Sequence, residues 1–396
     1  MSILERRLPA WWAALLVVLA CVAVPGGLLS SGWGGDVYYY SHIGERIAHG
    51  KVPYHDFYLE YPPGSIPVFA APSLVSQAHY HLLFKLLMTL CAAGAAAAGV
   101  GALTRAGAEE RARTRAVVLL GVAPLALGPL YLNRYDVWPA ALVAFALLAL
   151  VAARFRLAFA LLAAATVAKV YAIAFVPVAV IHVLRRRGPR ELVRSLAAFV
   201  VLGLLATLPF AAVGFGGLGY SFYIQATRQL QVESLGAQLL VAAGHLGLYE
   251  PTSAVGAPGS SNLVGPGAGA VGVISSVVEV AAVLLVAYWY RRGPADRPRL
   301  LLAAAAAVAA FVALGKVLSP QYLVWLIPVV PLVAGGVGIA ASALLVAALV
   351  MTQIAFYDSD GVAQLTAVSW LVLARDLVLV ALTALLTREL VRSARA

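Results

Sequence analysis

Ten apolar runs, separated by short arginine clusters, constrain the fold of this chain more than any other feature of its sequence. The runs cover residues 9–31, 80–104, 116–131, 137–153, 157–184, 195–213, 271–290, 300–315, 323–354 and 366–386. A helix needs about 20 apolar residues to cross the hydrocarbon core of a bilayer. Hydrophobic residues make up 62% of the chain and charged residues 11%, so the chain has too few polar side chains for a soluble fold. The sequence therefore excludes a soluble enzyme and a disordered chain, and predicts one all-α polytopic membrane domain over residues 1–396.

The arginines between the runs predict the topology. They form six groups: Arg6 and Arg7; Arg105, Arg111, Arg113 and Arg115; Arg154 and Arg156; Arg185–Arg187, Arg190 and Arg194; Arg291, Arg292, Arg297 and Arg299; and Arg388, Arg392 and Arg395. Because short cytoplasmic loops of membrane proteins carry an excess of Lys and Arg, we expect all six groups and both termini in the cytoplasm. The net charge of +11 then reflects topology, and we expect no nucleic-acid partner.

Two runs must be divided to satisfy this topology. Run 157–184 begins and ends beside cytoplasmic arginines, so we expect it to cross twice with a turn near Lys169. The same argument divides run 323–354 near Gly335 and Gly336. The total becomes about 12 spans, and spans of about 12–14 residues are too short for a straight crossing. We expect a bundle in which several helices are short or broken beside a protein-lined cavity, where irregular backbone is tolerated.

Two long segments, residues 32–79 and 214–269, fall on the extracytoplasmic side of this topology. More than half of the acidic residues lie on that side as well, so a functional site is expected there. The second segment ends in a Gly/Ser/Pro-rich stretch at residues 253–269, for which we expect a mobile loop or lid.

An amphipathic helix is predicted directly after the first run. Val37, Tyr40, Ile43 and Ile47 recur at helical spacing, which is typical of a helix lying in the membrane surface. Asp36 stands at its start. It could cap the helix, because Asp is a preferred N-cap residue, or act as a general base at the membrane–water boundary, and the two roles are compatible.

Two further outer segments combine acidic and aromatic residues. Residues 52–64 read V-P-Y-H-D-F-Y-L-E-Y-P-P-G, in which the prolines fix an extended loop. Its aromatic side chains could anchor the loop at the interface, or stack on a sugar whose hydroxyls bond Asp56 and Glu60. Residues 133–139 form a short turn, in which Arg134 and Asp136 could make a local pair that caps a helix. Alternatively, Asp136 is a second acid facing the same cavity as Asp36.

Three cations are expected at the outer ends of helices. Lys169, Arg228 and Lys316 lie in the segments A-K-V-Y, T-R-Q-L-Q-V-E-S and K-V-L-S-P-Q-Y. An unpaired charge at membrane depth costs about 2.5–3.5 kcal/mol or more. The two lysines could therefore snorkel to the headgroups. The alternative is that the three cations bind a phosphate, to which Arg228 would donate a forked pair of hydrogen bonds.

The remaining polar residues within spans favour structural roles. For Glu279 and the Arg375–Asp376 pair we expect interhelical ion pairs. His79 and His81 are two residues apart and would face different sides of a helix, so no metal site is predicted. Cys21 and Cys91 lie in apolar runs and indicate neither a disulfide nor a metal site.

Taken in order, these motifs resemble glycosyltransferase family 87. The series is G-G-D-V-Y, V-P-Y-x-D-F-x-x-E-Y-P-P-G, N-R-Y-D-x-W-P-A, A-K-V-Y, R-x-L-Q-V-E-S and K-V-L-S-P-Q-Y-L-x-W, and it spans about residues 30 to 330. The family comprises actinobacterial membrane proteins of the GT-C superfamily, and includes mannosyltransferases that use polyprenyl-phosphate-mannose. The resemblance implies a GT-C fold, a polyprenyl-phosphate-linked sugar donor and an inverting transfer to a glycolipid or cell-envelope glycan.

The resemblance implies that the acid of the first outer loop, which is Asp36 here, is the catalytic base. The motifs themselves add Asp136 as the reserve candidate, together with a set of binding residues. The expected substrate-binding residues are Asp56, Glu60, Tyr61, Arg134, Asp136, Lys169, Tyr171, Arg228, Glu233, Lys316, Gln321 and Tyr322. Neither a cofactor nor a metal is expected, because the lipid-linked sugar is a substrate and the cations can hold its phosphate.

Physical chemistry leads to the same expectation. A nucleotide sugar is too highly charged to cross a bilayer, so a sugar transferase facing outward needs a lipid-carried donor. The cations would stabilise the charge that develops on the departing lipid phosphate, while a carboxylate takes the proton of the attacking hydroxyl. The rival interpretation is a transporter or a lipid-linked sugar flippase, which would also use broken helices. Transporter sites lie near the midplane, whereas these charges gather at one face, so the enzyme is favoured. A non-catalytic scaffold would share the topology.

Overall fold

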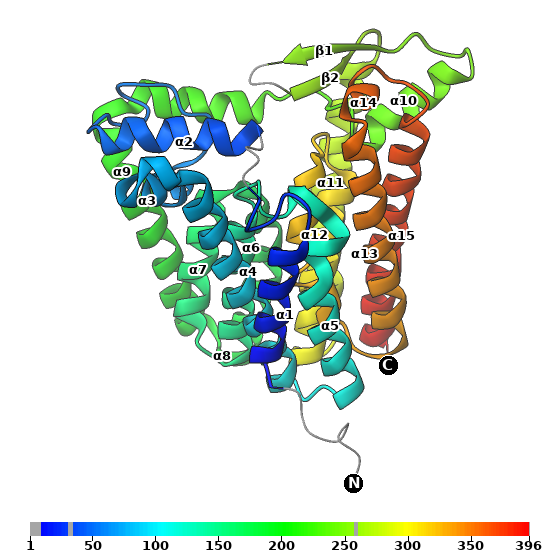
Figure 1. Ribbon diagram of the computed structural model, residues 1–396. Helices are drawn as coiled ribbons and strands as arrows, with labels where there is room; N and C mark the ends of the chain where they lie inside the picture. Colours follow the sequence, from blue (N-terminus) through cyan, green and yellow to red (C-terminus); the bar gives the residue numbers. More distant parts are fainter. Residues whose placement is uncertain (1–8, 31–34, 257–259, 396) are drawn as a thin grey trace.

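The computed structural model describes residues 9–30, 35–256 and 260–395. Long helices run side by side along one axis, and shorter elements cover one end of the bundle (Figure 1). Among the described residues, seven helices are long and apolar enough to span a membrane. They are α4 (Tyr80–Arg105), α5 (Glu110–Leu127), α9 (Pro189–Ala226), α11 (Ala268–Arg292), α12 (Arg297–Leu314), α13 (Gly335–Tyr357) and α15 (Ser369–Arg395). The chain is an all-α polytopic membrane protein, as predicted.

Shorter apolar helices complete the bundle. They are α1 (Trp11–Ala23), α6 (Val137–Val151), α7 (Phe155–Ala168) and α8 (Val176–Arg187). The predicted division of run 157–184 is confirmed, because α7 ends at Ala168 and Lys169 has extended backbone angles. A 3₁₀ helix, Val170–Phe175, then leads into α8. The division of run 323–354 is also confirmed, because α13 begins at Gly335, whose φ is +71°.

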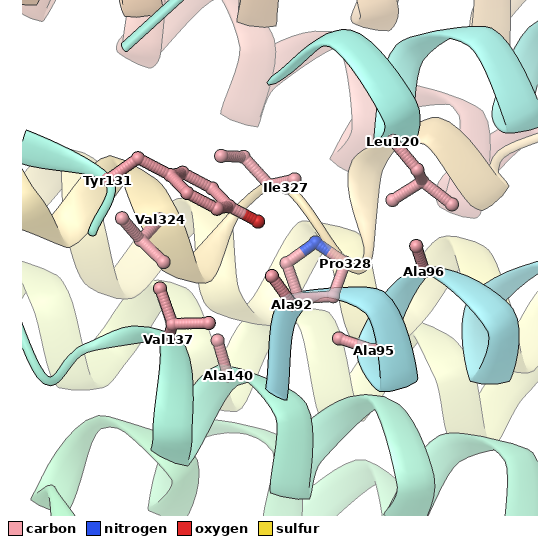
Figure 2. A pocket seen from close by; sticks show the side chains of 10 residues that line it. All are labelled: Ala92, Ala95, Ala96, Leu120, Tyr131, Val137, Ala140, Val324, Ile327 and Pro328. Carbon is pink, nitrogen blue, oxygen red and sulfur yellow. The ribbon is translucent and has the colours of Figure 1, made fainter. Parts of the chain in front are cut away.

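The segment before α13 is a broken helix inside the protein. It consists of two 3₁₀ helices, Pro320–Trp325 and Val330–Leu332, and its side chains from Leu323 to Leu326 are buried. Figure 2 shows Pro328 beside the small side chains Ala92, Ala95 and Ala96 of α4. The gap between them measures only about 10 Å³ and is lined by apolar residues, so it is too small and too apolar to hold a water molecule well. The irregular backbone is thus surrounded by protein here, which is one of the environments at membrane depth that tolerate it.

The arginine groups gather at one end of the bundle, where they join the helix termini. Arg297 donates to the carbonyl of Arg105 at the end of α4, over 2.9 Å, and Arg185 donates to the carbonyl of Arg291 at the end of α11, also over 2.9 Å. Arg299, only 4% exposed, donates to the carbonyls of Trp289, Tyr290, Pro294 and Leu390 and to Ser393 Oγ. This grouping was predicted, except that Arg6 and Arg7 lie outside the described residues.

The predicted amphipathic helix is α2 (Gly35–Ala48), which lies across the other end of the bundle with α3 (Ile66–Val75) (Figure 1). Its residues Val37, Tyr40 and Ile43 are buried as the spacing predicted. They pack on protein, however: the Tyr40 ring stacks on Phe69 of α3 at 4.5 Å between centroids. The apolar face therefore fixes α2 to the bundle and is not available to lie in a lipid surface.

The second long segment is more regular than expected. Helix α9 continues past a kink at Gly214 to Ala226, and α10 (Leu235–His245) follows. The stretch at residues 253–269 is not an irregular loop in its described part, because β1 (Thr252–Gly256) and β2 (Ser260–Val264) pair antiparallel; that it acts as a lid stays a prediction. Residues 257–259 lie outside the described residues. The hairpin also bonds the preceding chain, since Leu263 N–H donates to Leu230 and Val232 N–H donates to Ser261.

Two glycines allow the first outer segment to pack closely on the bundle. A Cβ atom at Gly64 would lie 2.5 Å from the backbone nitrogen of Ala168, the last residue of α7. Trp138 Nε1 donates to the Gly64 carbonyl over 3.1 Å. A Cβ atom at Gly217 of α9 would lie 2.0 Å from the carbonyl oxygen of Tyr54. The loop that precedes α3 is therefore held between α6, the end of α7 and the outer part of α9.

Candidate active site

A cavity of about 920 Å³ lies at the end of the bundle that carries α2 and the hairpin. Its walls come from α2, the first outer segment, the chain around Lys169, the outer part of α9, the hairpin, α11 and the broken segment. It brings together these predicted residues: Asp36, Glu60, Tyr61, Arg134, Lys169, Tyr171, Arg228, Glu233, Lys316, Gln321 and Tyr322. Residues distant in sequence thus face one space, which is large enough for a ligand.

Asp36 lies in the first turn of α2, and its carboxylate faces the cavity. It forms an ion pair with Arg134 and accepts a long hydrogen bond, 3.4 Å, from Tyr40 OH one turn later. The side chain remains 34% exposed. Residues 31–34, which include Gly34 of the predicted motif, lie outside the described residues. The helix start aims the carboxylate, and the ion pair with Arg134 holds it in position.

Asp136 precedes α6 and is 1% exposed. Its Oδ1 atom accepts a hydrogen bond from Lys169 Nζ over 2.6 Å and another from Trp325 Nε1 over 2.9 Å. The proposed local pair of Arg134 with Asp136 is therefore wrong. Each residue pairs across segments instead, Arg134 with Asp36 and Asp136 with Lys169.

Lys169 points into the protein and does not snorkel to a headgroup level. Its side chain is 16% exposed, and Nζ lies 4.7 Å from the centre of the Tyr135 ring and 5.3 Å from that of Trp325. Trp325 is itself stacked with Tyr171 at 4.0 Å and with Tyr322 at 3.9 Å. Cation–π contacts and the Asp136 carboxylate together compensate the buried ammonium group.

Two other cations keep donor capacity toward the cavity. Within the described part of the chain, the Arg228 side chain has no hydrogen bond or ion pair, and its buried Nε atom has no acceptor. Lys316 Nζ donates to the carbonyl of Ala226 over 3.2 Å, which leaves two of its three protons for another partner. The chain therefore offers one guanidinium and one ammonium to an anion.

Glu60 presents a buried carboxylate to the same cavity. Its main-chain carbonyl accepts hydrogen bonds from Ser221 Oγ over 2.9 Å and Gln225 Nε2 over 3.2 Å, which fix its position against α9. Glu60 is 6% exposed, and its Oε2 atom has no partner among the described residues. Burial raises the pKa of Glu60, although a hydrogen bond with Tyr61 opposes the shift. The free oxygen is available to a hydroxyl group.

Asp56 is not brought to the cavity. Its Oδ2 atom accepts a hydrogen bond from the Val52 N–H over 2.7 Å, and Oδ1 contacts His55 Nδ1 at 2.8 Å. The bond from Val52 is the main reason that the pKa of Asp56 is lowered. The side chain closes a turn at the surface of the first outer segment, and Asp56 is not among the residues that line the cavity.

The chain from Tyr58 to Pro320 matches the family model described as Glycosyltransferase family 87. The chain belongs to glycosyltransferase family 87. A search of curated proteins gives no match. This member of glycosyltransferase family 87 is therefore a membrane glycosyltransferase, and the matched stretch holds Glu60, Arg134, Asp136, Arg228 and Lys316. Asp36 lies before the matched stretch, so its position at the cavity of this family 87 protein rests on the structure alone.

Two other acidic residues that line the family 87 cavity, Glu233 and Glu279, differ in whether they form an ion pair. Glu233 is held by Arg375, whose Nη1 donates to it over 2.8 Å, and the buried Arg375 also pairs with Asp376. The predicted structural ion pair of Arg375 is thus confirmed and extended to Glu233. The prediction for Glu279 is wrong, because within the described residues it forms no ion pair and faces the cavity.

Sequence reasoning missed several residues of this glycosyltransferase cavity. Tyr39, Gln225, Gln231 and Trp325 also line it, and Gln231 Nε2 donates to Ser319 Oγ over 2.9 Å. Trp325 and Gln231 both fall inside motifs that carry the family resemblance, so that signal was present in the sequence. Among the described residues, no group of three His, Cys, Asp or Glu side chains could hold a metal ion.

Proposed function

We propose that this glycosyltransferase transfers a sugar from a polyprenyl-phosphate donor to an acceptor hydroxyl, with inversion, and that Asp36 is the general base. The observation that carries the proposal is that Asp36 and the two cations with free donor capacity, Arg228 and Lys316, line one cavity. A base and an anion-binding pair are the two functions that this reaction requires on either side of a sugar. Because the donor is itself the substrate, the reaction needs no cofactor.

The leaving group is a lipid phosphate, on which negative charge grows as the glycosidic bond breaks. Arg228 and Lys316 are suited to stabilise that charge, because donors already fixed in a water-poor site favour the transition state. Lys169 is less suited to contact the phosphate, since Asp136 already engages its ammonium group at 2.6 Å. Its proposed role is to fix Asp136 and the ring of Trp325 behind the sugar.

Asp36 is better placed to act as a base than Asp136. Its side chain is 34% exposed and lines the cavity, whereas Asp136 is 1% exposed and is not among the lining residues. In the proposed step, the acceptor hydroxyl gives its proton to the Asp36 carboxylate. Its oxygen bonds the anomeric carbon, and the carbon–oxygen bond to the phosphate breaks on the opposite face. The ion pair with Arg134 holds the carboxylate in position for this transfer.

The sugar would lie between these groups. Glu60 Oε2 and Tyr171 OH are buried polar atoms without partners in the described structure, and both residues line the cavity. We propose that they bond sugar hydroxyls, while Tyr61 and Tyr322 supply aromatic surface. Mannose is the sugar that the family resemblance favours, and the acceptor is a glycolipid or a cell-envelope glycan.

The proposed orientation places the cavity on the extracytoplasmic face of the cell membrane. The arginine groups lie at the end of the bundle opposite α2, and such groups favour the cytoplasm. Sugar donors that are made inside the cell reach the outer face only when carried by a lipid. A polyprenyl-phosphate donor fits both the position of the cavity and its cations.

The test measures transfer of radiolabelled mannose from synthetic polyprenyl-phosphate-mannose to a total lipid extract by the purified protein. Asp36→Asn should lower the initial rate by about 10²–10⁴-fold, which is the usual contribution of a general base. Asp56→Asn is the matched control, since Asp56 belongs to a neighbouring surface turn, and it should keep the rate within about twofold.

Two outcomes would contradict the proposal. Equal rates for Asp36→Asn and the unchanged protein would exclude Asp36 as the base and move attention to Asp136. Failure of the folded protein to use lipid-phosphate-linked mannose, glucose or arabinofuranose would exclude the donor class. A protein that moved the donor across vesicles without transferring its sugar would instead be a flippase.

A further inference from the structure

A second hollow, of about 740 Å³, opens at the arginine end of the bundle, far from the candidate active site. Its walls are apolar side chains of α6 and α7, including Phe145, Leu148 and Leu157. Three arginines from three different segments line it: Arg105 at the end of α4, Arg154 between α6 and α7, and Arg297 at the start of α12. We call these walls and arginines the basal groove.

The charge in the basal groove is unbalanced. None of its lining residues is acidic, and three carboxylates on adjoining segments are engaged elsewhere. Glu110 pairs with Arg113, Glu191 pairs with Arg156, and Asp296 accepts the Arg299 N–H as the N-cap of α12. Within the described residues, no carboxylate forms an ion pair with any of the three groove arginines. An anion in the groove would therefore meet three guanidinium groups that no described carboxylate engages in an ion pair.

The three guanidinium groups retain donors for such an anion. Arg297 Nη1 donates to the Arg105 carbonyl over 2.9 Å, which uses one of its five protons. Arg105 Nη1 makes a long contact of 3.4 Å with the carbonyl of Gly101. Among the described residues, the Arg154 side chain has no hydrogen bond or ion pair. One guanidinium group can donate two parallel hydrogen bonds to the oxygens of a phosphate, so three such groups suit a phosphate ligand.

The apolar walls decide the source of the phosphate. Leu157 and Phe145 are exposed side chains on α7 and α6, two helices of the membrane bundle. A free phosphate ion gains nothing from leucine and phenylalanine, whereas acyl chains do. Basic pockets between spanning helices are suited to anionic lipid headgroups. We infer that the basal groove is a binding site for one anionic phospholipid, whose phosphate lies between Arg105, Arg154 and Arg297 and whose acyl chains follow α6 and α7.

The experiment uses native mass spectrometry of the purified full chain in detergent, titrated with phosphatidylglycerol or phosphatidylcholine. The unchanged protein should bind one phosphatidylglycerol more tightly than phosphatidylcholine. Arg105→Gln and Arg154→Gln should each weaken phosphatidylglycerol binding by about fivefold, which is the contribution of one arginine to holding an anionic lipid. Arg186→Gln is the matched control, because Arg186 is exposed at the same end but does not line the groove. It should change binding by less than about twofold.

A second variant tests whether the shape of the groove contributes to lipid binding independently of the charge of its arginines. Ala152→Trp fills the groove from its wall and leaves all three arginines, so it should also weaken phosphatidylglycerol binding. The inference is overturned if Arg154→Gln and Arg186→Gln weaken binding equally, because general attraction to a basic surface would then explain it. It is also overturned if glycerol 3-phosphate displaces the lipid at equal concentration, since the acyl chains would then contribute nothing. Neither result depends on glycosyltransferase activity.

Discussion

The two ends of the bundle use charged side chains in opposite ways. At the arginine end, Arg299, Arg297 and Arg185 donate to main-chain carbonyls at the ends of helices. At the cavity end, Asp36 pairs with Arg134 and Asp136 pairs with Lys169, side chain to side chain across distant segments. Cations bonded to the C-terminal carbonyls of helices stabilise the fold directly. Charges paired around a space keep that space polar at membrane depth.

The comparison shows why residue type alone does not indicate function in this chain. Arg299 and Arg228 are both arginines beside apolar helices. Arg299 donates hydrogen bonds to protein carbonyls, whereas the Arg228 side chain donates to no described residue. An unsatisfied buried donor is costly in a structural role, but it is what a ligand site requires. The difference between the two ends lies in which donors and acceptors remain unpaired.

The largest effect is expected from breaking the paired charges behind the cavity. Asp136→Ala leaves the Lys169 ammonium buried without its carboxylate and should lower the free energy of unfolding by about 3–5 kcal/mol. Denaturant titration in mixed micelles measures the change. The double variant Asp136→Ala with Lys169→Met should recover part of the loss, because it removes the unpaired charge. If Asp136→Ala is as stable as the unchanged protein, the Asp136–Lys169 pair does not contribute to the stability of the fold.

The next effect concerns the arginine end. Arg299→Ala removes bonds to α11 and α15 together and should destabilise the protein by about 3 kcal/mol. The KM for the lipid-linked donor should not change, because Arg299 lies at the opposite end from the cavity. Arg186→Ala is the control and should stay within about 0.5 kcal/mol, since its side chain is exposed. If Arg299→Ala changed the KM for the donor and left stability unchanged, the structural role assigned to the arginine end would be wrong.

A smaller effect should be confined to the cavity end. Arg228→Gln should lower kcat/KM for the donor by about tenfold, the equivalent of one charge-assisted hydrogen bond to the phosphate. Its stability should be unchanged, because no described neighbour loses a partner. Steady-state kinetics at several donor concentrations measure it, with the exposed Lys51→Gln as control. A normal kcat/KM for Arg228→Gln would remove this residue from the phosphate site.

The smallest effect is a difference in the pH dependence of stability. Burial raises the pKa of Glu60, so the folded protein binds this proton more tightly than the unfolded chain, whose carboxyl titrates near about 4.3. Stability contributed by this proton is present below that pH and is lost as the pH rises through the folded pKa. The Gln side chain of Glu60→Gln cannot titrate. The stability of this variant relative to the unchanged protein should therefore increase as the pH rises from the unfolded pKa to the folded pKa.

Asp56→Asn provides the matched control for Glu60, because its shift has the opposite sign. The pKa of Asp56 is lowered, so its contribution is present above the unfolded pKa and is lost as the pH falls. The Asn variant should therefore lose relative stability as the pH rises through the folded pKa. Parallel curves for the two variants would contradict the assigned environments. Thermal unfolding in one detergent from about pH 2 to about pH 8 compares them, because the Asp56 window lies below the unfolded value of about 3.9.

Local patterns predicted much of the fold. The arginine groups at both ends of run 157–184 predicted the break at Lys169, because a charge group fixes the side on which a helix ends. The spacing of Val37, Tyr40 and Ile43 predicted α2 and its buried face. Strands β1 and β2 were missed because the composition of their segment is that of a flexible loop. Backbone hydrogen bonds with Leu230 and Val232 stabilise the paired strands, and the local composition gives no indication of these bonds.

Most of the residues proposed for the site lie at one cavity, but the pairing of their side chains was not predicted. Motif resemblance gathered residues from Asp36 to Tyr322, and most of them line the cavity. It did not predict that Arg134 would bond Asp36 across 98 positions of sequence and leave its neighbour Asp136 to Lys169. One sequence shows which residues are near each other along the chain, and side-chain pairing depends on which segments pack together. Asp56 was included for its motif, and its own turn keeps it away from the cavity.

The close contact of Gly64 with the end of α7 has a consequence for how this protein can evolve. A Cβ at position 64 would meet the backbone of Ala168, one residue before the lysine that holds Asp136. Any larger residue there would have to be accompanied by a shift of the α7 end, and with it of Lys169. Position 64 and the stretch around Ala168 are therefore expected to change together among descendants of this chain. A library that randomises both should recover active pairs that neither single library contains.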